Sequence, residues 1–381
     1  MLHKLAWFQL ITEKRRLAAA LAGIAFAVML QLTEFGVRDA LFESAISFHK
    51  HLVADLVLTS SLYENELLPG RVSHRRLYQA LGVPGVESVV PIYLGLAPFK
   101  NVDNGFDKTI VVIGVDTTET VLDIPAVNDK LYLINVPDVA LYDRMARPEY
   151  GAVLDIVERD GEVTTEVAGR RMRIAGLYEL GVSFGVNGNL VLSEATFRRM
   201  FNRSESVFEI GLIRLQPGAG VLATQAELVR VLPNDVKVLT RGQLNDIEKA
   251  YWRANTPIGF IFTLGAIVGL LVGLVIVYQI LYTDVNDHLA EYATLKAMGY
   301  SDRHLNFVVL EEALILSVLG FPVGFGLTLL IYRAARNATH LPIFMNVPLA
   351  SMVFGLTVLM CAGSGLIAVR KLKSADPAEV F

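Results

Sequence analysis

The sequence predicts an α-helical membrane protein in which four transmembrane helices carry one large α+β domain, inserted between the first and the second helix. Two features predict this fold class. The 381 residues are 53% hydrophobic and only 19% charged, whereas soluble domains are about 45–50% apolar and about 25% charged. The excess of apolar residues is concentrated in four runs, each long enough to cross a bilayer. One long polar segment separates the first run from the other three.

The first predicted span covers residues 17–38 and follows a segment, residues 1–16, that ends in Lys14, Arg15 and Arg16. Basic residues before an apolar core are also typical of a cleaved signal peptide. Here the apolar core is long, no small-x-small cleavage site follows it cleanly, and the next residues continue a helical pattern. We therefore interpret the run as an uncleaved signal anchor.

The remaining spans are predicted at residues 257–282, 307–333 and 347–369. The second has no charge over 25 residues, and the fourth is also free of charge, as a hydrocarbon environment favours. The third has Glu311 and Glu312 in its first turns and Pro322 near its middle, where we expect a kink.

Basic residues predict the orientation of these spans. Nine Lys and Arg residues lie in or beside the segments 1–16, 283–306 and 370–381, against two near the loop 334–346. This distribution predicts a multi-pass protein of the inner (plasma) membrane with both termini in the cytoplasm. Residues 39–256 would then form a periplasmic domain.

The pattern within residues 39–256 predicts short strands mixed with short helices, which indicates an α+β domain. The predicted strands are residues 55–60, 86–94, 109–115, 151–157, 172–178, 189–192, 208–215 and 236–240. The predicted helices are residues 74–81, 193–201 and 221–231. Two further helical stretches, residues 37–53 and 241–255, would join the domain to the first and second spans like a stalk.

The sequence offers no recognisable catalytic, cofactor or metal site. It has no lysine-containing phosphate loop, no His-Glu-x-x-His and no Gly-x-Ser-x-Gly. His49 and His51 are two apart on a predicted helix and make a poor metal pair. The glycine-rich residues 181–189 are interpreted as a turn or surface loop, with a partner-binding surface as the alternative. A net charge of −4 argues against nucleic acid as a partner.

Gly265, Gly269 and Gly273 recur at every fourth position of the second span. Small residues at this spacing let helix backbones approach closely, so that van der Waals contact drives association in lipid. The sequence favours a homodimer contact on this face, with packing inside the same chain as the alternative.

A short amphipathic helix is predicted directly after the second span. Its apolar residues recur at helical spacing and are Val285, Leu289, Tyr292, Leu295 and Met298, and Gly299 fits its C-terminus. Such a helix could lie in the lipid headgroups. Its polar face is acidic, however, with Asp284, Asp287 and Glu291, and anionic lipid would repel that face. A protein partner on the cytoplasmic side fits better.

In this segment the sequence shows a family resemblance. Glu291-Tyr-Ala-Thr-Leu-Lys-Ala-Met-Gly299 resembles the E-x-x-x-L-+-A-x-G signature of MacB/FtsX/LolC permeases of ABC transporters, whose layout is also one span, a large domain and three spans. More specifically, the chain resembles DevC-type permeases. The similar stretches are Ala6-Trp-Phe-Gln-Leu, Gly36-Val-Arg-Asp-Ala-Leu-Phe-Glu-Ser-Ala, Leu177-Tyr-Glu-Leu-Gly-Val-Ser-Phe-Gly, Gly211-Leu-Ile-Arg-Leu-Gln-Pro-Gly, residues 278–300 and Asp376-Pro-Ala.

The resemblance implies a homodimer bound to two copies of a DevA-like ATPase subunit, which would bind the ATP and Mg. The amphipathic segment would be the helix that couples to this ATPase, through Val285, Leu289, Glu291, Tyr292, Leu295, Lys296, Met298 and Gly299. A DevB-like membrane fusion protein and a TolC-like duct would complete a glycolipid exporter, in which closure of the dimer is relayed to the periplasmic domain.

Two alternatives remain at the level of sequence. One is an FtsX-like mechanical relay that transports nothing and activates a periplasmic partner. The other is a membrane-anchored sensor or adhesion domain without an ATPase, which does not explain the acidic amphipathic segment.

Overall fold

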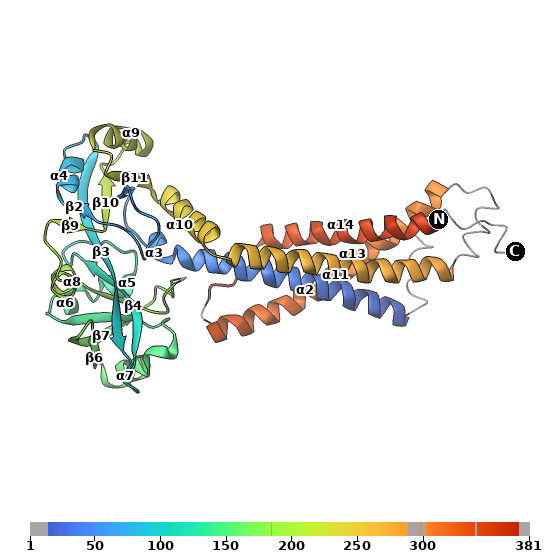
Figure 1. Cartoon of the computed structure of the whole chain (residues 1–381), viewed down its shortest axis with the longest axis horizontal. Helices are drawn as coiled ribbons and strands as arrows, with labels where there is room; N and C mark the ends of the chain where they lie inside the picture. Colours follow the sequence, from blue (N-terminus) through green and yellow to red (C-terminus); the bar gives the residue numbers. More distant parts are fainter. Residues whose placement is uncertain are drawn as a thin grey trace. The chain divides into compact units, whose positions relative to one another are not determined.

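The computed structural model describes residues 14–183, 185–288, 294, 298, 302–339 and 341–372. The chain divides into two compact units. The helical unit comprises Met1–Ala40, Pro257–Ala338 and Ile343–Phe381. The domain comprises Leu41–Thr256 together with Thr339–Pro342. Figure 1 shows the elements of both units in sequence colours.

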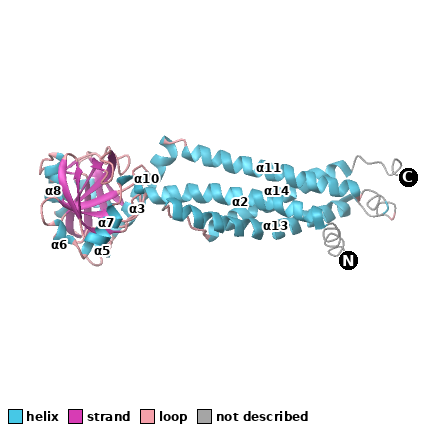
Figure 2. Cartoon of the chain, turned by 90° about the horizontal axis from the view of Figure 1, so that it is seen from below, coloured by secondary structure: helices cyan, strands magenta, loops and turns pink. Residues whose placement is uncertain are grey.

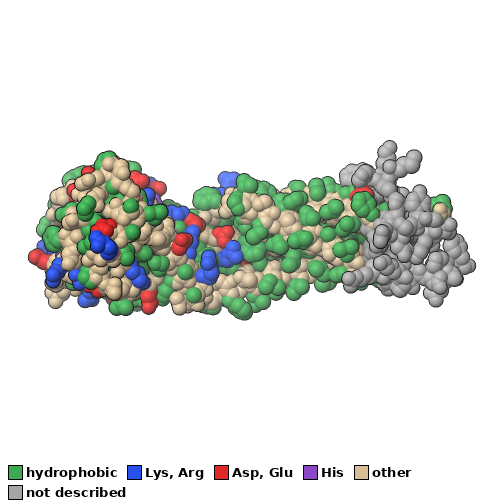
Figure 3. Space-filling view, turned by 90° about the horizontal axis from the view of Figure 1, so that it is seen from above, with side chains coloured by type: hydrophobic (Ala, Val, Ile, Leu, Met, Phe, Trp, Pro, Cys, Tyr) green, Lys and Arg blue, Asp and Glu red, His purple; other side chains and the backbone are tan. Residues whose placement is uncertain are grey.

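Four helices of the described residues are long and apolar enough to cross a membrane. They are α2 (Lys14–Ala45), α11 (Ile258–Asp287), α13 (Asp302–Thr339) and α14 (Val347–Leu372). Figure 3 shows the hydrophobic side chains that cover one side of this bundle. The predicted fold class, four spans with an inserted mixed domain, is confirmed.

Each helix extends beyond the span predicted from hydropathy. The largest difference that bears on function is in α11, which continues from the predicted end at residue 282 to Asp287. The first residues of the predicted cytoplasmic segment 283–306 therefore belong to the same helix as the second span. Helical hydrogen bonding does not have to stop where the apolar run stops, because polar residues continue a helix readily in water.

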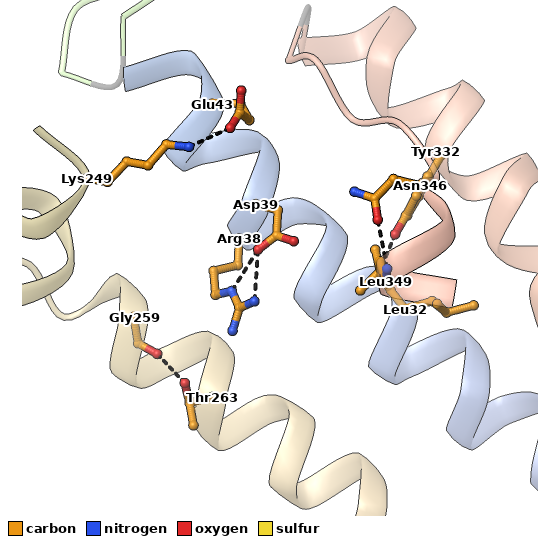
Figure 4. Close-up of polar contacts among 10 residues, drawn as sticks. All are labelled: Leu32, Arg38, Asp39, Glu43, Lys249, Gly259, Thr263, Tyr332, Asn346 and Leu349. Atoms are coloured by element: carbon orange, nitrogen blue, oxygen red, sulfur yellow. Dashed lines mark hydrogen bonds and ion pairs between the residues drawn. The ribbon is translucent and has the colours of Figure 1, made fainter. Parts of the chain in front are cut away.

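Helix α2 lies against both α11 and α13. Its Ile24 is fully buried and contacts Gly320 of α13. Its Gly23 faces Ile276 of α11. Further along both helices, the Tyr332 hydroxyl of α13 donates a hydrogen bond to the Leu32 carbonyl of α2 (Figure 4). The core of the helical unit is formed by Ala, Val, Leu, Ile and Met side chains of these helices and α14.

The described part of the domain is built on a nine-stranded mixed sheet with the order β11-β1-β10-β3-β4-β8-β5-β7-β6. Figure 2 shows the strands in magenta, with short helices around them. The strands are β1 (Leu56–Ser60), β3 (Val86–Lys100), β4 (Asp107–Val115), β5 (Val139–Asp143), β6 (Val163–Val167), β7 (Arg170–Tyr178), β8 (Asn189–Ser193), β10 (Ile210–Leu215) and β11 (Val236–Thr240). The short strands β2 (Val72–Ser73) and β9 (Val207–Phe208) pair separately. Only β4–β8 and β5–β7 pair in parallel. Strand β3 also pairs with β6, at Phe99 and Val167, which closes that part of the sheet on itself.

Short helices cover the sheet. They are α3 (Ser47–Lys50), α4 (Arg75–Leu81), α5 (Pro125–Asn128), α6 (Leu131–Ile134), η1 (Pro148–Tyr150), α7 (Val153–Asp160), α8 (Glu194–Phe201), α9 (Val221–Val231) and α10 (Arg241–Asn255). Successive strand residues point to opposite faces, and each face has its own hydrophobic core. Helix α10 begins with a capping box, in which Thr240 and Gln243 exchange side-chain and backbone hydrogen bonds.

The strand predicted at residues 151–157 is wrong, because this segment forms helix α7. Val153 and Val157 are buried four positions apart, on one face of the helix. Gly161 ends α7 in the left-handed conformation with φ of 84°, which glycine adopts without steric cost. The apolar run is short, and hydrophobicity alone does not distinguish a strand from a helix at that length.

Candidate functional site

The predicted coupling segment is described only in part. Val285 lies on the last turn of α11, is buried, and packs against Val309 of α13. Thr294 accepts a hydrogen bond from the Met298 backbone N–H at 3.0 Å, four residues apart as in a helical turn. The Met298 side chain is 63% exposed. The other proposed coupling residues, namely Leu289, Glu291, Tyr292, Leu295, Lys296 and Gly299, lie outside the described residues.

An ion pair joins the start of α2 to the end of α11. The Arg16 guanidinium contacts the Asp287 carboxylate. The beginning of the first span and the beginning of the coupling segment therefore lie at the same end of the helical unit. This placement agrees with a topology in which residues 1–16 and 283–306 are on one side of the membrane.

The glycine face of the second span packs inside the chain. A Cβ atom added at Gly269 would lie 3.0 Å from Leu30, and one added at Gly273 would lie 2.6 Å from Ala27 and 2.4 Å from Met360. A Cβ atom at Gly265 would lie 2.7 Å from Glu34. Helix α2, with Met360 of α14, therefore occupies this face.

These distances are those of packing within the chain, which was the alternative to the homodimer contact expected at Gly265, Gly269 and Gly273. The spacing of the glycines correctly indicates a close helix–helix contact but does not identify the partner helix. A homodimer contact on this face stays a prediction.

The two chain segments that enter and leave the domain lie side by side at its root. Lys249 of α10 contacts the Glu43 carboxylate at 2.7 Å, and Lys50 of α3 also pairs with Glu43 (Figure 4 shows the first contact). Arg253 of α10 lies over the ring of Phe42, 5.6 Å from its centroid. Although partial burial opposes it, the two Lys ammonium groups hold the pKa of Glu43 below its usual value.

A buried polar cluster lies at the same root of the domain. We call it the junction cluster; its members are His49, Tyr63, Glu66, Glu248 and Trp252. The Glu248 carboxylate accepts hydrogen bonds from the Tyr63 hydroxyl at 3.0 Å, the Glu66 backbone N–H at 2.9 Å and the Trp252 Nε1–H at 2.9 Å. His49 Nε2 lies 3.0 Å from the Tyr63 hydroxyl. Glu248, Glu66 and His49 are each at most 3% exposed.

Burial shifts the protonation equilibria of this cluster. Burial, and secondly the charge of Glu248, raises the pKa of Glu66 to about 8. Burial also raises the pKa of Glu248 to about 7, against the opposing effect of its three hydrogen-bond donors. Burial lowers the pKa of His49 to about 3, so this imidazole is neutral at physiological pH.

The glycine-rich loop after β7 covers the junction cluster. Gly181 has φ of 94°, and its backbone N–H donates to the buried Asp143 carboxylate at 2.9 Å. A Cβ atom at Gly185 would lie 2.5 Å from Leu67 and 3.4 Å from Trp252. The loop is therefore a packed structural turn, as its glycine content indicates, rather than a phosphate cradle.

Sequence reasoning missed the junction cluster, although it considered one of its members. His49 and His51 do point to different surroundings: His51 Nδ1 hydrogen-bonds the Ser47 carbonyl at 2.9 Å, whereas His49 faces the cluster. One signal was available in α10. Glu248 follows the buried Leu244 by four residues and so lies on the buried face of that helix.

Comparison with known families gives one match, in the C-terminal part of the chain. Residues 263–377 match the family described as FtsX-like permease C-terminal. The match begins inside α11 and includes the coupling segment, α13 and α14, so it covers the three spans that follow the domain.

Two curated proteins of Mycobacterium tuberculosis are similar over a longer stretch. They are the uncharacterized ABC transporter permeases Rv0072 (strain ATCC 25618 / H37Rv) and MT0078 (strain CDC 1551 / Oshkosh), each 22% identical over 240 residues. The match covers 62% of this chain and 62% of each relative. Together with the FtsX-like match, it supports the superfamily of ABC transporter permeases for this chain.

Solved structures give similarities confined to about half of the chain. The extracellular domain of the noncanonic ABC-type transporter YknZ from Gram-positive bacteria covers 49% of this chain and 99% of its own length, with 14% identity and a TM-score of 0.34. The periplasmic region of MacB from Actinobacillus actinomycetemcomitans covers 51% of this chain and 92% of its own length, with 11% identity and a TM-score of 0.36. TM-scores this low do not by themselves establish a common fold.

Proposed function

We propose that this chain is the permease subunit of an ABC exporter and has no ATPase site of its own. The observation that carries the proposal is the FtsX-like match of residues 263–377, on a chain whose first span and inserted domain precede it. In this proposal ATP and Mg are bound by a separate, DevA-like ATPase subunit. Both chain termini lie in the cytoplasm and the domain lies in the periplasm.

The proposed mechanism is the relay of force, and its cytoplasmic end is the coupling segment. Val285 belongs to α11 and is packed against α13, so a displacement of the segment after Asp287 would be transmitted directly to a spanning helix. The exposed Met298 and the apolar Leu289, Tyr292 and Leu295 would contact the ATPase, with Glu291, Lys296 and Gly299 shaping the helix and its end.

The periplasmic end of the relay is the pair of segments at the root of the domain. Helix α10 ends at Asn255 and α11 begins at Ile258, so the second span continues almost directly into the domain. Glu43 and Lys249 tie the entering and leaving segments together. Movement of α11 would therefore act on the domain through α10.

The finer assignment is a DevC-like permease of a tripartite exporter. The chain would form a homodimer, engage a DevB-like membrane fusion protein and, through it, a TolC-like duct, and export an envelope glycolipid or another hydrophobic cargo. The similarity of residues 278–300 to DevC-type permeases supports this assignment.

Leu295→Asp in the assembled complex tests the coupling role, with Leu295→Met as the matched control. A charge on the apolar face of the segment should abolish stimulation of the ATPase subunit, while Leu295→Met should retain it. Unchanged stimulation in Leu295→Asp would contradict the coupling role. Co-purification with mass spectrometry of bound proteins and lipids tests the finer assignment: a fusion protein and lipid support export, and a cell-wall hydrolase in their place would indicate an FtsX-like relay.

A further inference from the structure

The two buried carboxyl groups of the junction cluster have different surroundings. Glu248 accepts three hydrogen bonds, from Tyr63, Trp252 and the Glu66 backbone. The side-chain oxygens of Glu66 accept no hydrogen bond of good geometry, and the polar group that faces them is Ser183. A carboxylate with three donors is stabilised in its charged form, whereas a buried carboxyl faced by a single hydroxyl group is stabilised in its neutral form.

The hydrogen bonds also assign the protons on His49 and Tyr63. Because the Tyr63 hydroxyl donates to Glu248, its oxygen is free to accept from His49 Nε2–H at 3.0 Å. His49 Nδ1 is buried without a hydrogen-bond partner, as expected for the unprotonated nitrogen of a neutral imidazole. His49 therefore supplies no positive charge, although its Nε2 is only 4.0 Å from Glu248.

No other cation compensates the two carboxyl groups within the described part of the domain. On α10, Lys249 pairs with Glu43 instead, and on α3, Lys50 also pairs with Glu43. The remaining groups that face Glu66 are uncharged: Ser183 from the glycine-rich loop and Tyr178 from β7, whose hydroxyl is buried without a partner. Two like charges in one buried site are strongly unfavourable.

We propose that the pair Glu66 and Glu248 carries a single proton at neutral pH, on Glu66, and that α10 stays attached to the loop around Tyr63 because this proton keeps the pair from holding two negative charges. When Glu66 loses the proton, two buried negative charges face each other and no cation balances them. The available relief is to bring one carboxylate to water, which requires α10 to leave the domain or residues 61–68 to open. The inference concerns the domain alone and does not rest on the proposed transport function.

The consequence is a pH-sensitive attachment at the root of the domain. At neutral pH and below, the attachment is closed, because Glu66 is neutral and no pair of buried negative charges is present. Above neutral pH the attachment loosens, and α10 becomes mobile at its buried face. Since α10 leads into α11, the pH of the compartment that holds the domain would set how firmly this helix is fixed.

Hydrogen–deuterium exchange of the full-length protein in nanodiscs tests the proposal. Exchange is followed from about pH 6 to about pH 9 and corrected for the intrinsic pH dependence of the reaction. Peptides from α10 and from residues 61–68 should lose protection by roughly tenfold or more as Glu66 ionises, while β4 should stay protected. Glu66→Gln should keep α10 protected throughout, and the exposed Glu64→Gln should behave as wild type.

Infrared spectroscopy of the wild-type protein gives an independent measurement should Glu66→Gln fail to fold. A carboxylic C=O band should persist at neutral pH, and one component of it should disappear with the same midpoint as the loss of protection in α10; Glu209→Gln removes the contribution of the other buried glutamate whose pKa burial raises to about 7. The proposal is overturned by pH-independent protection of α10, by a folded Glu66→Gln that responds to pH as wild type does, or by a carboxylic band whose midpoint differs from that of α10.

Discussion

The helical unit and the domain bury their polar groups in different ways. In the helical unit, buried threonine hydroxyl groups bond to their own helix: Thr328 Oγ1 donates to the Gly324 carbonyl and Thr357 Oγ1 to the Val353 carbonyl. Hydrogen bonds between its helices are made by the hydroxyl groups of Tyr332 and Ser364, each of which donates to a backbone carbonyl of a neighbouring helix. In the domain, buried polar groups bond across long stretches of chain, as Glu248 does with Tyr63, 185 residues away. In the first arrangement, packing between helices depends mainly on the shape of the side chains. The second makes packing depend on protonation and on partner groups.

This difference shows where each unit is sensitive. Helices of the helical unit approach through Gly23, Gly269, Gly273, Gly320 and Gly324, where added volume has no space. The domain is stabilised by large buried side chains and by hydrogen-bonded networks of polar groups. A substitution that shortens such a side chain or changes its charge leaves the neighbouring groups without partners. The two units should therefore respond to different substitutions.

The largest effect is expected from removing an aromatic ring from the core of the domain. Phe197 is fully buried and contacts the rings of Tyr93 and Phe201 at centroid distances of 5.6 Å and 4.5 Å. Phe197→Ala should lower the free energy of unfolding of the domain by about 3–5 kcal/mol. Denaturation followed by Trp252 fluorescence, in a Trp7→Phe background, measures it.

Tyr132→Ala is the matched control for Phe197→Ala, because Tyr132 is an aromatic side chain of the same domain that is 67% exposed. It should change the unfolding free energy by a few tenths of a kcal/mol, as is typical of surface positions. Equal losses in the two variants would show that burial in this domain does not determine stability.

The next largest effect is expected from adding volume at the glycine face. In Gly273→Leu the first added carbon would already lie 2.4 Å from Met360 and 2.6 Å from Ala27. The helical unit should lose about 1–3 kcal/mol of stability, measured as a lower thermal midpoint in detergent. Gly355→Leu on α14, where nothing lies within 4 Å of the added carbon, should leave the midpoint nearly unchanged. If only Gly355→Leu destabilised the protein, the assigned packing face would be wrong.

A smaller and reversible effect is expected from pH, and it should be confined to the domain. The folded-state pKa values of Glu66 and Glu248 are raised from 4.5 to about 8 and about 7. Their contribution to stability is therefore complete below about pH 4.5 and is lost as the pH rises through 7 and 8. His49 acts in the opposite direction: its pKa falls from 6.5 to about 3, so its contribution is complete above 6.5 and is lost as the pH falls towards 3.

The thermal midpoint of the domain should therefore be highest in the mildly acidic range and fall on both sides. Glu66→Gln should reduce the fall on the alkaline side, part of which remains because burial raises the pKa of both Glu248 and Glu209 to about 7. It should leave the acidic side unchanged, because His49 remains. His49→Gln should change the acidic side instead. A midpoint that rises steadily from pH 5 to 8 would contradict the assigned directions of the carboxyl shifts.

Hydrophobic periodicity in the sequence predicted those helices and strands that bury one face and expose the other. Helix α9 and strand β11 have the predicted bounds, because the periods of 3.6 and 2 are clear in residues 221–231 and 236–240. Strand β5 was missed: all five of its residues are buried between β7 and β8, so it shows no alternation. Its position depends on neighbours that are remote in sequence.

Those parts of the candidate site that lie on a single helix could be predicted from the sequence. The apolar stripe of the coupling segment and the glycine spacing are properties of a single helix and can be read from sequence. Which helix fills the glycine face depends on α2, more than 200 residues earlier in the chain. The junction cluster likewise joins Glu66 to Glu248, 182 residues apart, and no local period relates these positions.

The smallest effect is expected at the ion pairs between the segments that enter and leave the domain. Glu43 contacts Lys249 at 2.7 Å with both side chains partly exposed, at 37% and 29%. Pairs of this kind contribute about 0.2–1 kcal/mol, because solvent screens them and ordering two long side chains costs entropy. A double-mutant cycle of Glu43→Gln and Lys249→Met should give a coupling energy in this range that decreases with salt. A coupling energy well above this range that persists at high salt would show that solvent does not screen the Glu43–Lys249 pair. Glu43 would then behave like the buried carboxyl groups of the junction cluster and not like a surface charge.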